Sequence, residues 1–202
     1  MTGLFYVSCG RQIDDKSLVT GDLLFAGVRF DNQEDLSSAI NEVTQTNKQT
    51  NYFHVGITEV HDDTVWVIHA APGKGVCREQ LGKFTDNSDV VDVYRLKDSY
   101  RSFISDALER SRALIGQPYD SVYIMGSGHG YYCSGLIFTL FEGYGVFSLE
   151  PMTFKDPQTG EFHPEWVEYY EKMGRAIPEG LPGCNPNGMA ASPSLFFAGR
   201  LK

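Results

Sequence analysis

The chain has few of the features that would tie it to a metal, a membrane or a nucleic acid. Its four cysteines, at positions 9, 77, 133 and 184, form no Cys-x-x-Cys pair, which argues against a zinc ribbon. No apolar run approaches the roughly 20 residues of a membrane-spanning helix. Basic residues are outnumbered, 17 against 26 acidic ones, and the net charge is −9. With no basic cluster either, nucleic acid is not an expected partner.

What is present is the composition of an ordinary globular protein. The 202 residues are 42% hydrophobic and 21% charged, which is enough to bury a core without disulfide support. We therefore predict a single domain over residues 1–202, with residues 1–20 as a segment that can lie outside the core. The even cysteine count permits a disulfide, for instance between Cys77 and Cys184, but does not require one. No motif implies a cofactor, and no feature indicates the oligomeric state.

The N-terminus has two interpretations. Residues 1–10 contain a short apolar piece without the basic start of a complete signal peptide. The end of this piece, Val7-Ser8-Cys9-Gly10, is similar to the tail of a bacterial lipoprotein signal. One hypothesis is therefore an exported protein anchored through lipid on Cys9. The alternative is a first strand or a loose end on a cytoplasmic protein.

Hydrophobic patterning predicts more strands than helices. Strands are expected over residues 21–28, 53–60, 64–70, 73–78, 90–96 and 195–201, and helices over 99–115, 133–141 and 165–173. The polar stretch 31–50 is predicted to form a short helix, either as a lid over a site or as decoration, and 178–194 an extended loop. Strand pairs followed by helices are typical of an α+β domain with an antiparallel sheet packed against helices.

One cysteine stands where a nucleophile would be useful. Cys133 follows a glycine-rich lead and opens an apolar run, so it is predicted at a helix N-terminus. Free N–H groups and the helix dipole stabilise a thiolate there, and the thiolate is the nucleophilic form. The alternative is a buried structural cysteine.

Two histidines fall inside predicted strands of one hairpin. A loop of two residues (61–62) or of four (60–63) places His54 directly opposite His69, with Cβ atoms about 5 Å apart. One imidazole would then orient the other. The alternatives are half-buried structural histidines, or a zinc site made by His54, His69 and Cys133. No tight ligand spacing supports the zinc site.

Four blocks of this sequence resemble a known group of enzymes. They are Gly21-Asp22-Leu23-Leu24-Phe25, His54-Val55-Gly56-Ile57, Val67-Ile68-His69-Ala70 and Tyr132-Cys133-Ser134-Gly135-Leu136. The first three resemble, in order, the blocks that follow the catalytic cysteine helix in NlpC-type cell-wall cysteine peptidases, where the cysteine block comes first. Here it comes last, an order that resembles the circularly permuted papain-like enzymes of the YiiX/YaeF group. Lecithin:retinol acyltransferase is a more distant relative.

The resemblance implies a role for each matching residue. Cys133 would be the nucleophile, His54 the general base and then acid, and His69 the group that orients His54. Many members of the permuted group have Glu in place of His69, a departure that leaves the substrate class open. The oxyanion would be bound by the Cys133 backbone N–H and a side chain, with Tyr119 and Tyr132 as candidates. Both tyrosines can also be explained as core packing.

These observations predict a thiol-dependent hydrolase that cleaves an amide through an acyl-enzyme. The expected substrate is a small peptide, an amide or a fragment of bacterial cell wall. The same site would serve a lipid acyl hydrolase or acyltransferase, and the polar character of residues 31–50 favours the soluble substrate. A non-catalytic module that binds peptides or amino acids is the third possibility. The set Cys133, His54 and His69 argues against it, since a binder has no need of all three.

Overall fold

The computed structural model describes residues 11–28, 36–46, 50–86 and 88–202. Its strands are β1 (Leu23–Gly27), β2 (Tyr52–His61), β3 (Thr64–Ala71), β4 (Gly75–Gln80), β5 (Val90–Leu96), β6 (Glu150–Pro151), β7 (Pro182–Gly183) and β8 (Leu195–Arg200). Its α-helices are α1 (Leu36–Val43), α2 (Leu81–Thr85), α3 (Ile104–Leu114), α4 (Cys133–Leu140), α5 (Pro164–Lys172) and α6 (Pro186–Ala190), and its 3₁₀ helices are η1 (Asp15–Ser17) and η2 (Asp98–Phe103). The segment that holds Cys9 lies outside the described residues.

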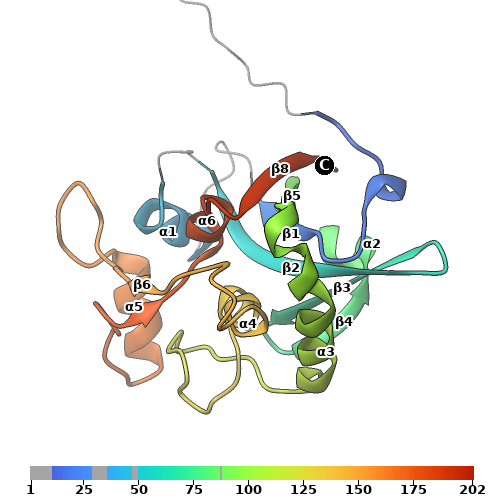
Figure 1. Ribbon diagram of the computed structural model, residues 1–202. Helices are drawn as coiled ribbons and strands as arrows, with labels where there is room; N and C mark the ends of the chain where they lie inside the picture. The colour runs from blue at the N-terminus through green and yellow to red at the C-terminus, as the bar shows by residue number, and fades with distance from the viewer. Residues whose placement is uncertain (1–10, 29–35, 47–49, 87) are drawn as a thin grey trace, which may run out of the picture.

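A six-stranded antiparallel sheet forms the centre of the molecule, in the order β4-β3-β2-β1-β5-β8. Helix α4 lies across one face of this sheet, with α3 on one side and α5, β6 and β7 on the other (Figure 1). The α+β class and the antiparallel sheet packed against helices, both predicted from the sequence, are confirmed. None of the described helices has both the length and the apolar character needed to cross a membrane.

The main core lies between the sheet and α4. Leu136, Ile137 and Leu140 of α4 are fully buried against the side chains of β2 that face them, among them Val55 and Ile57. Each such side chain contributes about 1.5–3 kcal/mol on leaving water. Alternate residues of a strand point to opposite faces of the sheet. His54 and Gly56 therefore face a second, smaller cluster around Val67 and Phe84. The core therefore fixes α4, and with it Cys133, against β2.

The β2–β3 hairpin differs from its predicted register. The turn consists of Asp62 and Asp63, both with positive φ (46° and 60°), and His61 pairs with Thr64. Asp is among the few residues that tolerate this left-handed conformation, which the tightest hairpin turns require. The pairing is thus displaced by two residues from the predicted one, and His54 does not lie directly opposite His69. A two-residue displacement keeps both histidines on the same face, where diagonal neighbours can still touch.

Two further predictions need correction. The helix expected over residues 99–115 is divided into η2 and α3. Its end is as predicted, since Gly116 follows with a φ of 91°. The segment 178–194, expected as an extended loop, contains β7 and α6. Helix α6 forms because Pro186 opens it and the Asn185 side chain caps it, accepting a hydrogen bond from the Gly188 N–H at 2.7 Å.

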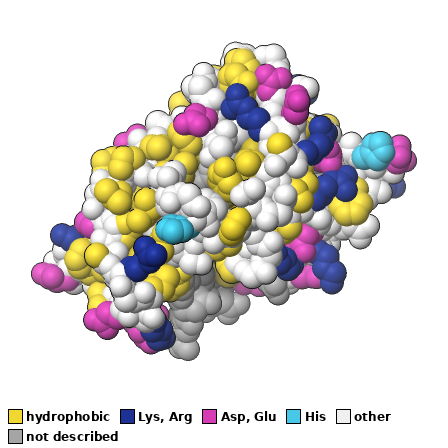
Figure 2. Space-filling view, turned by 90° about the horizontal axis from the view of Figure 1, so that it is seen from below, with side chains coloured by type: hydrophobic (Ala, Val, Ile, Leu, Met, Phe, Trp, Pro, Cys, Tyr) yellow, Lys and Arg dark blue, Asp and Glu magenta, His cyan; other side chains and the backbone are white. Residues whose placement is uncertain are grey.

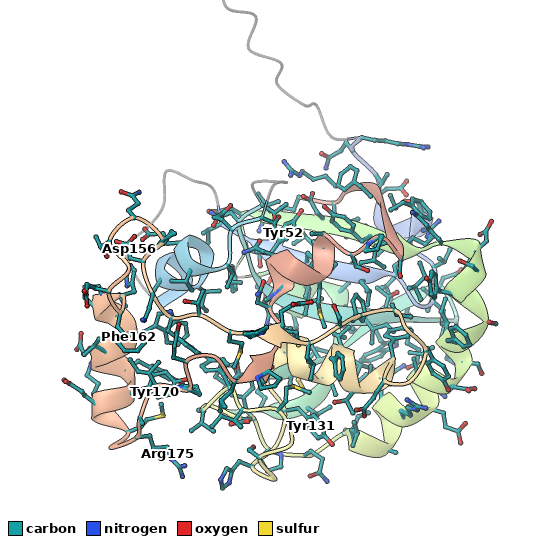
Figure 3. The ribbon with its side chains drawn as sticks, turned by 60° about the vertical axis from the view of Figure 1, so that its left-hand side comes forward. Tyr52, Tyr131, Asp156, Phe162, Tyr170 and Arg175 are labelled. Carbon is teal, nitrogen blue, oxygen red and sulfur yellow. The ribbon has the colours of Figure 1, made fainter. Side chains whose placement is uncertain are left out.

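A third group of side chains packs beside the sheet. Phe154, Trp166 and Tyr170 are buried together with Ala39 of α1. Tyr170 lies on α5 at the side of the molecule, well away from Tyr131, which precedes α4 (Figure 3). The short helix predicted within residues 31–50 is confirmed as α1, which contacts both α5 and β2.

Candidate active site

Cys133 is the first residue of α4, as the sequence predicts. The loop before it is held in place from within: the buried Asp120 carboxylate accepts hydrogen bonds from the Val122 N–H at 2.8 Å and the Ser127 hydroxyl at 3.0 Å. The Tyr131 N–H donates to the Pro118 carbonyl at 3.0 Å. The helix start is therefore a fixed position rather than the end of a loose loop.

The thiol of Cys133 is buried and uncharged. Its residue is 6% exposed, and its Sγ lies 3.9 Å from the Phe53 carbonyl oxygen. Burial raises the pKa of the thiol to about 11, although the backbone N–H groups of Ser134 and Val55 act in the opposite direction. The N–H groups of the helix start thus favour the thiolate, as predicted, but the loss of solvent outweighs them. In the free protein the proton stays on sulfur.

Three polar side chains, one each on β2, β3 and β4, form a chain of close contacts. The His54 Nε2 atom lies 2.7 Å from the His69 Nδ1 atom, and His69 Nε2 lies 3.1 Å from Oε2 of Glu79. Lys74 holds the other oxygen of Glu79 at 2.7 Å. We call Glu79, His69 and His54 the histidine chain. The predicted contact between the two histidines is therefore present, in spite of the different register.

The ionised carboxylate of Glu79 determines which ring nitrogens of His69 and His54 carry a proton. Lys74 and His69 lower the pKa of Glu79, so its carboxylate is ionised and can only accept. Burial lowers the pKa of His54 to about 3 and also lowers the pKa of His69, so both rings are neutral. His69 then carries its proton on Nε2, toward Glu79, and His54 carries its proton on Nε2, toward His69. This leaves a lone pair on His54 Nδ1, the nitrogen that a base needs.

A glycine makes the contact between the two rings possible. A Cβ atom on Gly56 would lie 2.6 Å from Cγ1 of Val67 and 3.2 Å from Cβ of His69. It would also lie 3.0 Å from the Phe84 ring, which packs against both histidine rings at centroid distances of 5.4 and 5.2 Å. The glycine in His54-Val55-Gly56-Ile57 is therefore required by the close packing around the histidine chain.

A β-bulge in β2 lies directly beside His54. The pairing of β1 with β2 shifts at Phe53, so the rings of Phe53 and His54 lie 6.5 Å apart at 26° instead of alternating. Bulges commonly redirect side chains beside active sites. Among the described residues no hydrogen bond joins Cys133 to His54, and His54 Nδ1 has no partner there. The thiol instead contacts the backbone on either side of His54, at Phe53 and Val55.

Cys133 also opens onto a cavity of about 740 Å³. Most of its wall is apolar or aromatic, and the residues come from segments distant in sequence. Among the lining residues are Ile40, Val43, Phe53, Tyr119, Tyr123, Tyr132, Phe147, Met152, Trp166, Cys184 and Met189. We call this space the aromatic cavity. Figure 2 shows a face of the molecule on which hydrophobic side chains reach the surface in several patches, with charged ones mainly toward the edges.

The two candidate oxyanion tyrosines have different surroundings. Tyr119 lies close enough to Cys133 for the thiol to raise its pKa, although burial is the larger cause. The Tyr132 hydroxyl is directed at Cys184 instead: it lies 3.7 Å from that Sγ and accepts from the Cys184 N–H at 3.3 Å. Tyr119 is therefore the better placed of the two, and Tyr132 supports the wall of the cavity.

Sequence reasoning missed two cysteines and a glutamate that lie at the site. Cys184 lines the aromatic cavity, and Cys77 lies 3.4 Å from His69 Nε2. Both are free thiols, so they are not paired with each other. Within the described part of the chain, the possible metal ligands that gather within 4.8 Å are His69, Cys77 and Glu79, not the set of His54, His69 and Cys133. The signal for Glu79 was its i, i+2 spacing from Cys77 on β4, which depends on the correct register.

A family model decides what this arrangement belongs to. The model of the permuted papain-like amidase enzymes YaeF/YiiX, the C92 family, matches residues 17–197. The chain belongs to this family. It is accordingly a cysteine amidase or peptidase by family, and the permuted block order described above is the order of the family. A search of curated proteins found no match.

A solved structure confirms the fold. It is described as the metalloprotein yiiX from Escherichia coli O157:H7, and it matches this chain with a TM-score of 0.70 at 19% sequence identity. The match covers 91% of this chain and 98% of the other. At this identity the likeness establishes the papain-like fold of the chain, while the chemistry must be argued from its own residues.

Proposed function

We propose that this protein hydrolyses an amide bond through an acyl-enzyme on Cys133, with His54 as the base. The observation that carries the proposal is the unbroken histidine chain. It begins at an ionised carboxylate and ends with a free lone pair on His54 Nδ1, beside the strand backbone that the thiol contacts. A buried structural cysteine would have no use for such an arrangement.

The reaction follows from these groups in two halves. His54 Nδ1 takes the proton from Cys133 as Sγ attacks the carbonyl carbon, and the resulting imidazolium donates that proton to the leaving amine. Water then enters, gives a proton to His54 and attacks the thioester. The tetrahedral intermediate collapses, and the proton returns to sulfur as the acid leaves. Glu79 and His69 hold the neutral His54 ring in the tautomer whose Nδ1 can accept a proton at the start of each half.

The proposed acid–base pair is neutral at rest. A thiol with a pKa of about 11 and an imidazole with a pKa of about 3 do not form an ion pair in the free protein. Proton transfer must then accompany the attack on substrate, and the imidazole has to approach Sγ as substrate binds. Hydrogen bonds between catalytic groups are often long in the free enzyme and shorten in the complex with substrate.

The developing oxyanion would be stabilised at the start of α4. The Cys133 N–H is in place there, and the Tyr119 hydroxyl is the side-chain donor that we assign to it. Tyr119 stays protonated at any ordinary pH, because burial and the neighbouring thiol raise its pKa. It can therefore donate a hydrogen bond without competing as a nucleophile.

For the substrate we favour a small peptide, an amide or a cell-wall fragment, in line with the amidase family. A lipid acyl group is the second candidate, and the aromatic cavity favours it. The wall contains Phe147, Met152 and Trp166, and helix α1 adds Ile40 and Val43 to it. Such a mainly apolar wall fits an acyl chain. The thioester intermediate is the same for both substrates.

We also propose that residues 1–202 form a single domain, in which residues 1–20 can lie outside the core; in support, one family model matches residues 17–197. Anchoring through Cys9 remains a proposal on the sequence alone. Metabolic labelling with a radioactive fatty acid in a bacterial host would test it, with Cys9→Ser as the control. Label that persists in Cys9→Ser would contradict the lipid anchor.

The function is tested with two matched substrate series. One series would carry short peptides on a fluorogenic amide, and the other would carry saturated acyl chains of increasing length on the same leaving group. We expect turnover that Cys133→Ala abolishes, and the series with the higher kcat/KM identifies the substrate class. Turnover that survives Cys133→Ala would overturn the proposal.

A further inference from the structure

Three side chains on the outer strands form a compact group of unlike ligand atoms. His69 on β3 pairs directly with Cys77 on β4, and Glu79 lies two residues beyond Cys77 on the same face. His69 Nε2 lies 3.4 Å from Cys77 Sγ and 3.1 Å from Glu79 Oε2, and the three ligand atoms all lie within 4.8 Å of one another. His69 is buried, and Cys77 and Glu79 are partly exposed, so the group is open to solvent on one side.

We propose that His69, Cys77 and Glu79 bind a zinc ion. Zinc takes nitrogen, sulfur and carboxylate oxygen at about 2.0–2.3 Å in a tetrahedron, which sets the ligand atoms about 3.3–3.7 Å apart. The two separations of 3.1 and 3.4 Å are already close to this spacing. A water molecule would occupy the fourth position on the open side. A thiolate and a carboxylate also neutralise the charge of the ion, which a partly buried site needs.

One neighbouring group opposes the ion. The Lys74 ammonium lies 2.7 Å from Glu79 Oε1, the carboxylate oxygen that does not face His69. Two positive charges on one carboxylate repel each other, so zinc binding must compete with this ion pair. The side chain of Lys74 is 56% exposed and can move into solvent. The site is therefore one that fills and empties with the zinc concentration, rather than a permanent structural site.

Zinc binding would switch off the base, and this consequence rests on the proposed function. His69 must offer the lone pair of Nε2 to the ion, so its proton moves to Nδ1. Nδ1 then donates to His54 Nε2, and His54 in turn carries its proton on Nδ1. Each ring keeps one proton, and the only proton released is that of the Cys77 thiol. The nitrogen that should accept the proton of Cys133 is now occupied.

Direct binding measurements on the full-length, zinc-free protein test the site. Zinc would be titrated against a chromophoric chelator, and cobalt would report sulfur ligation through a charge-transfer band. We expect about one ion per chain, a weakening of at least about 10-fold in Cys77→Ser, and tighter binding in Lys74→Gln. Cys184→Ser is the matched cysteine control and should bind zinc as the wild type does. Absence of stoichiometric binding, or an affinity that Cys77→Ser leaves unchanged, would overturn the site.

Two further measurements keep the test decisive. Zinc should protect Cys77, but not Cys184, from alkylation in the wild type, which needs no variant to fold. Where the zinc-free protein hydrolyses amides, zinc should inhibit it with the midpoint of the binding curve, and inhibition of Cys77→Ser should need at least about 10-fold more zinc. Zinc bound at Cys77 in a protein without hydrolytic activity would refute the proposed function and leave the site standing. Inhibition without protection of Cys77 would refute the site.

Discussion

The two sides of Cys133 are built in different ways. On one side the histidine chain is polar, is joined by contacts of 2.7 and 3.1 Å, and lies on consecutive strands of one sheet. On the other side the aromatic cavity is mostly apolar, and its wall is assembled from α1, α5 and the segments around residues 147 and 184. The comparison indicates that the two sides have different roles: the sheet provides the acid–base groups, and the segments around the cavity select the substrate.

The largest expected effect is the loss of the nucleophile between these two sides. Cys133→Ala should lower the rate of amide hydrolysis by at least about 10³-fold, because neither the histidine chain nor the cavity can replace sulfur. Steady-state assays with the fluorogenic amides would measure this. Thermal unfolding of the variant should resemble that of the wild type, and activity within tenfold of the wild type would contradict the nucleophile.

The next effect should come from the end of the histidine chain. His54→Gln keeps a side chain of similar size but removes the base, and kcat should fall by about 10²–10³-fold. The same substitution at His61, which is exposed beside the hairpin turn, is the matched control and should leave kcat within about twofold. Equal losses in the two variants would show that His54 has no special role.

A smaller effect should follow when the far end of the chain is altered. Glu79→Gln removes the charge that fixes the His69 tautomer, and we expect kcat to fall by about 10- to 100-fold with little change in KM. A change confined to KM would place Glu79 in substrate binding instead of in positioning.

The cavity side should respond in the opposite manner. Ile40→Ser removes apolar surface from the wall, and it should raise KM for long acyl chains by several-fold while leaving kcat for short amides unchanged. Parallel KM measurements on the two substrate series would test this. A loss of kcat on every substrate would show that the two sides of Cys133 are not separable.

The last effect concerns the free energy of unfolding, and it appears only when the pH falls below neutral. The pKa of His54 is about 3 in the folded chain, below the ordinary value of 6.5, so between these values the unfolded chain binds more protons. Stability is therefore complete above pH 6.5 and is lost as the pH falls toward 3, by up to roughly 3–5 kcal/mol. Calorimetric Tm values across this range should fall more steeply for the wild type than for His54→Gln. Parallel curves would contradict a buried neutral histidine.

The sequence predicted the histidine side much better than the cavity side. Cys133 before an apolar helix, and His54 and His69 within strands, are local patterns that survive folding. The register was predicted wrongly, because the turn is formed by Asp62 and Asp63, both with positive φ, and not by residues 61–62 or 60–63. Glu79 and Cys77 could be placed beside His69 only from the pairing of β3 with β4, which the sequence did not give.

The cavity could not be predicted for a different physical reason. Ile40, Trp166 and Met189 meet only because α1, α5 and α6 pack around the start of α4. No periodicity or spacing in the sequence encodes that meeting. The polar composition of residues 31–50 favoured a soluble substrate. Composition does not show which residues face inward, and here Ile40 and Val43 line the cavity.

The most direct test of the account is to trap the intermediate on Cys133. Wild-type protein would be mixed with a substrate that acylates quickly, such as an activated acyl ester, quenched in acid, digested, and mapped by mass spectrometry. The account predicts an acyl group on Cys133 in a burst of about one equivalent, and a much slower burst in His54→Gln. Acylation of Cys77 or Cys184 instead, or equal bursts with and without His54, would contradict it.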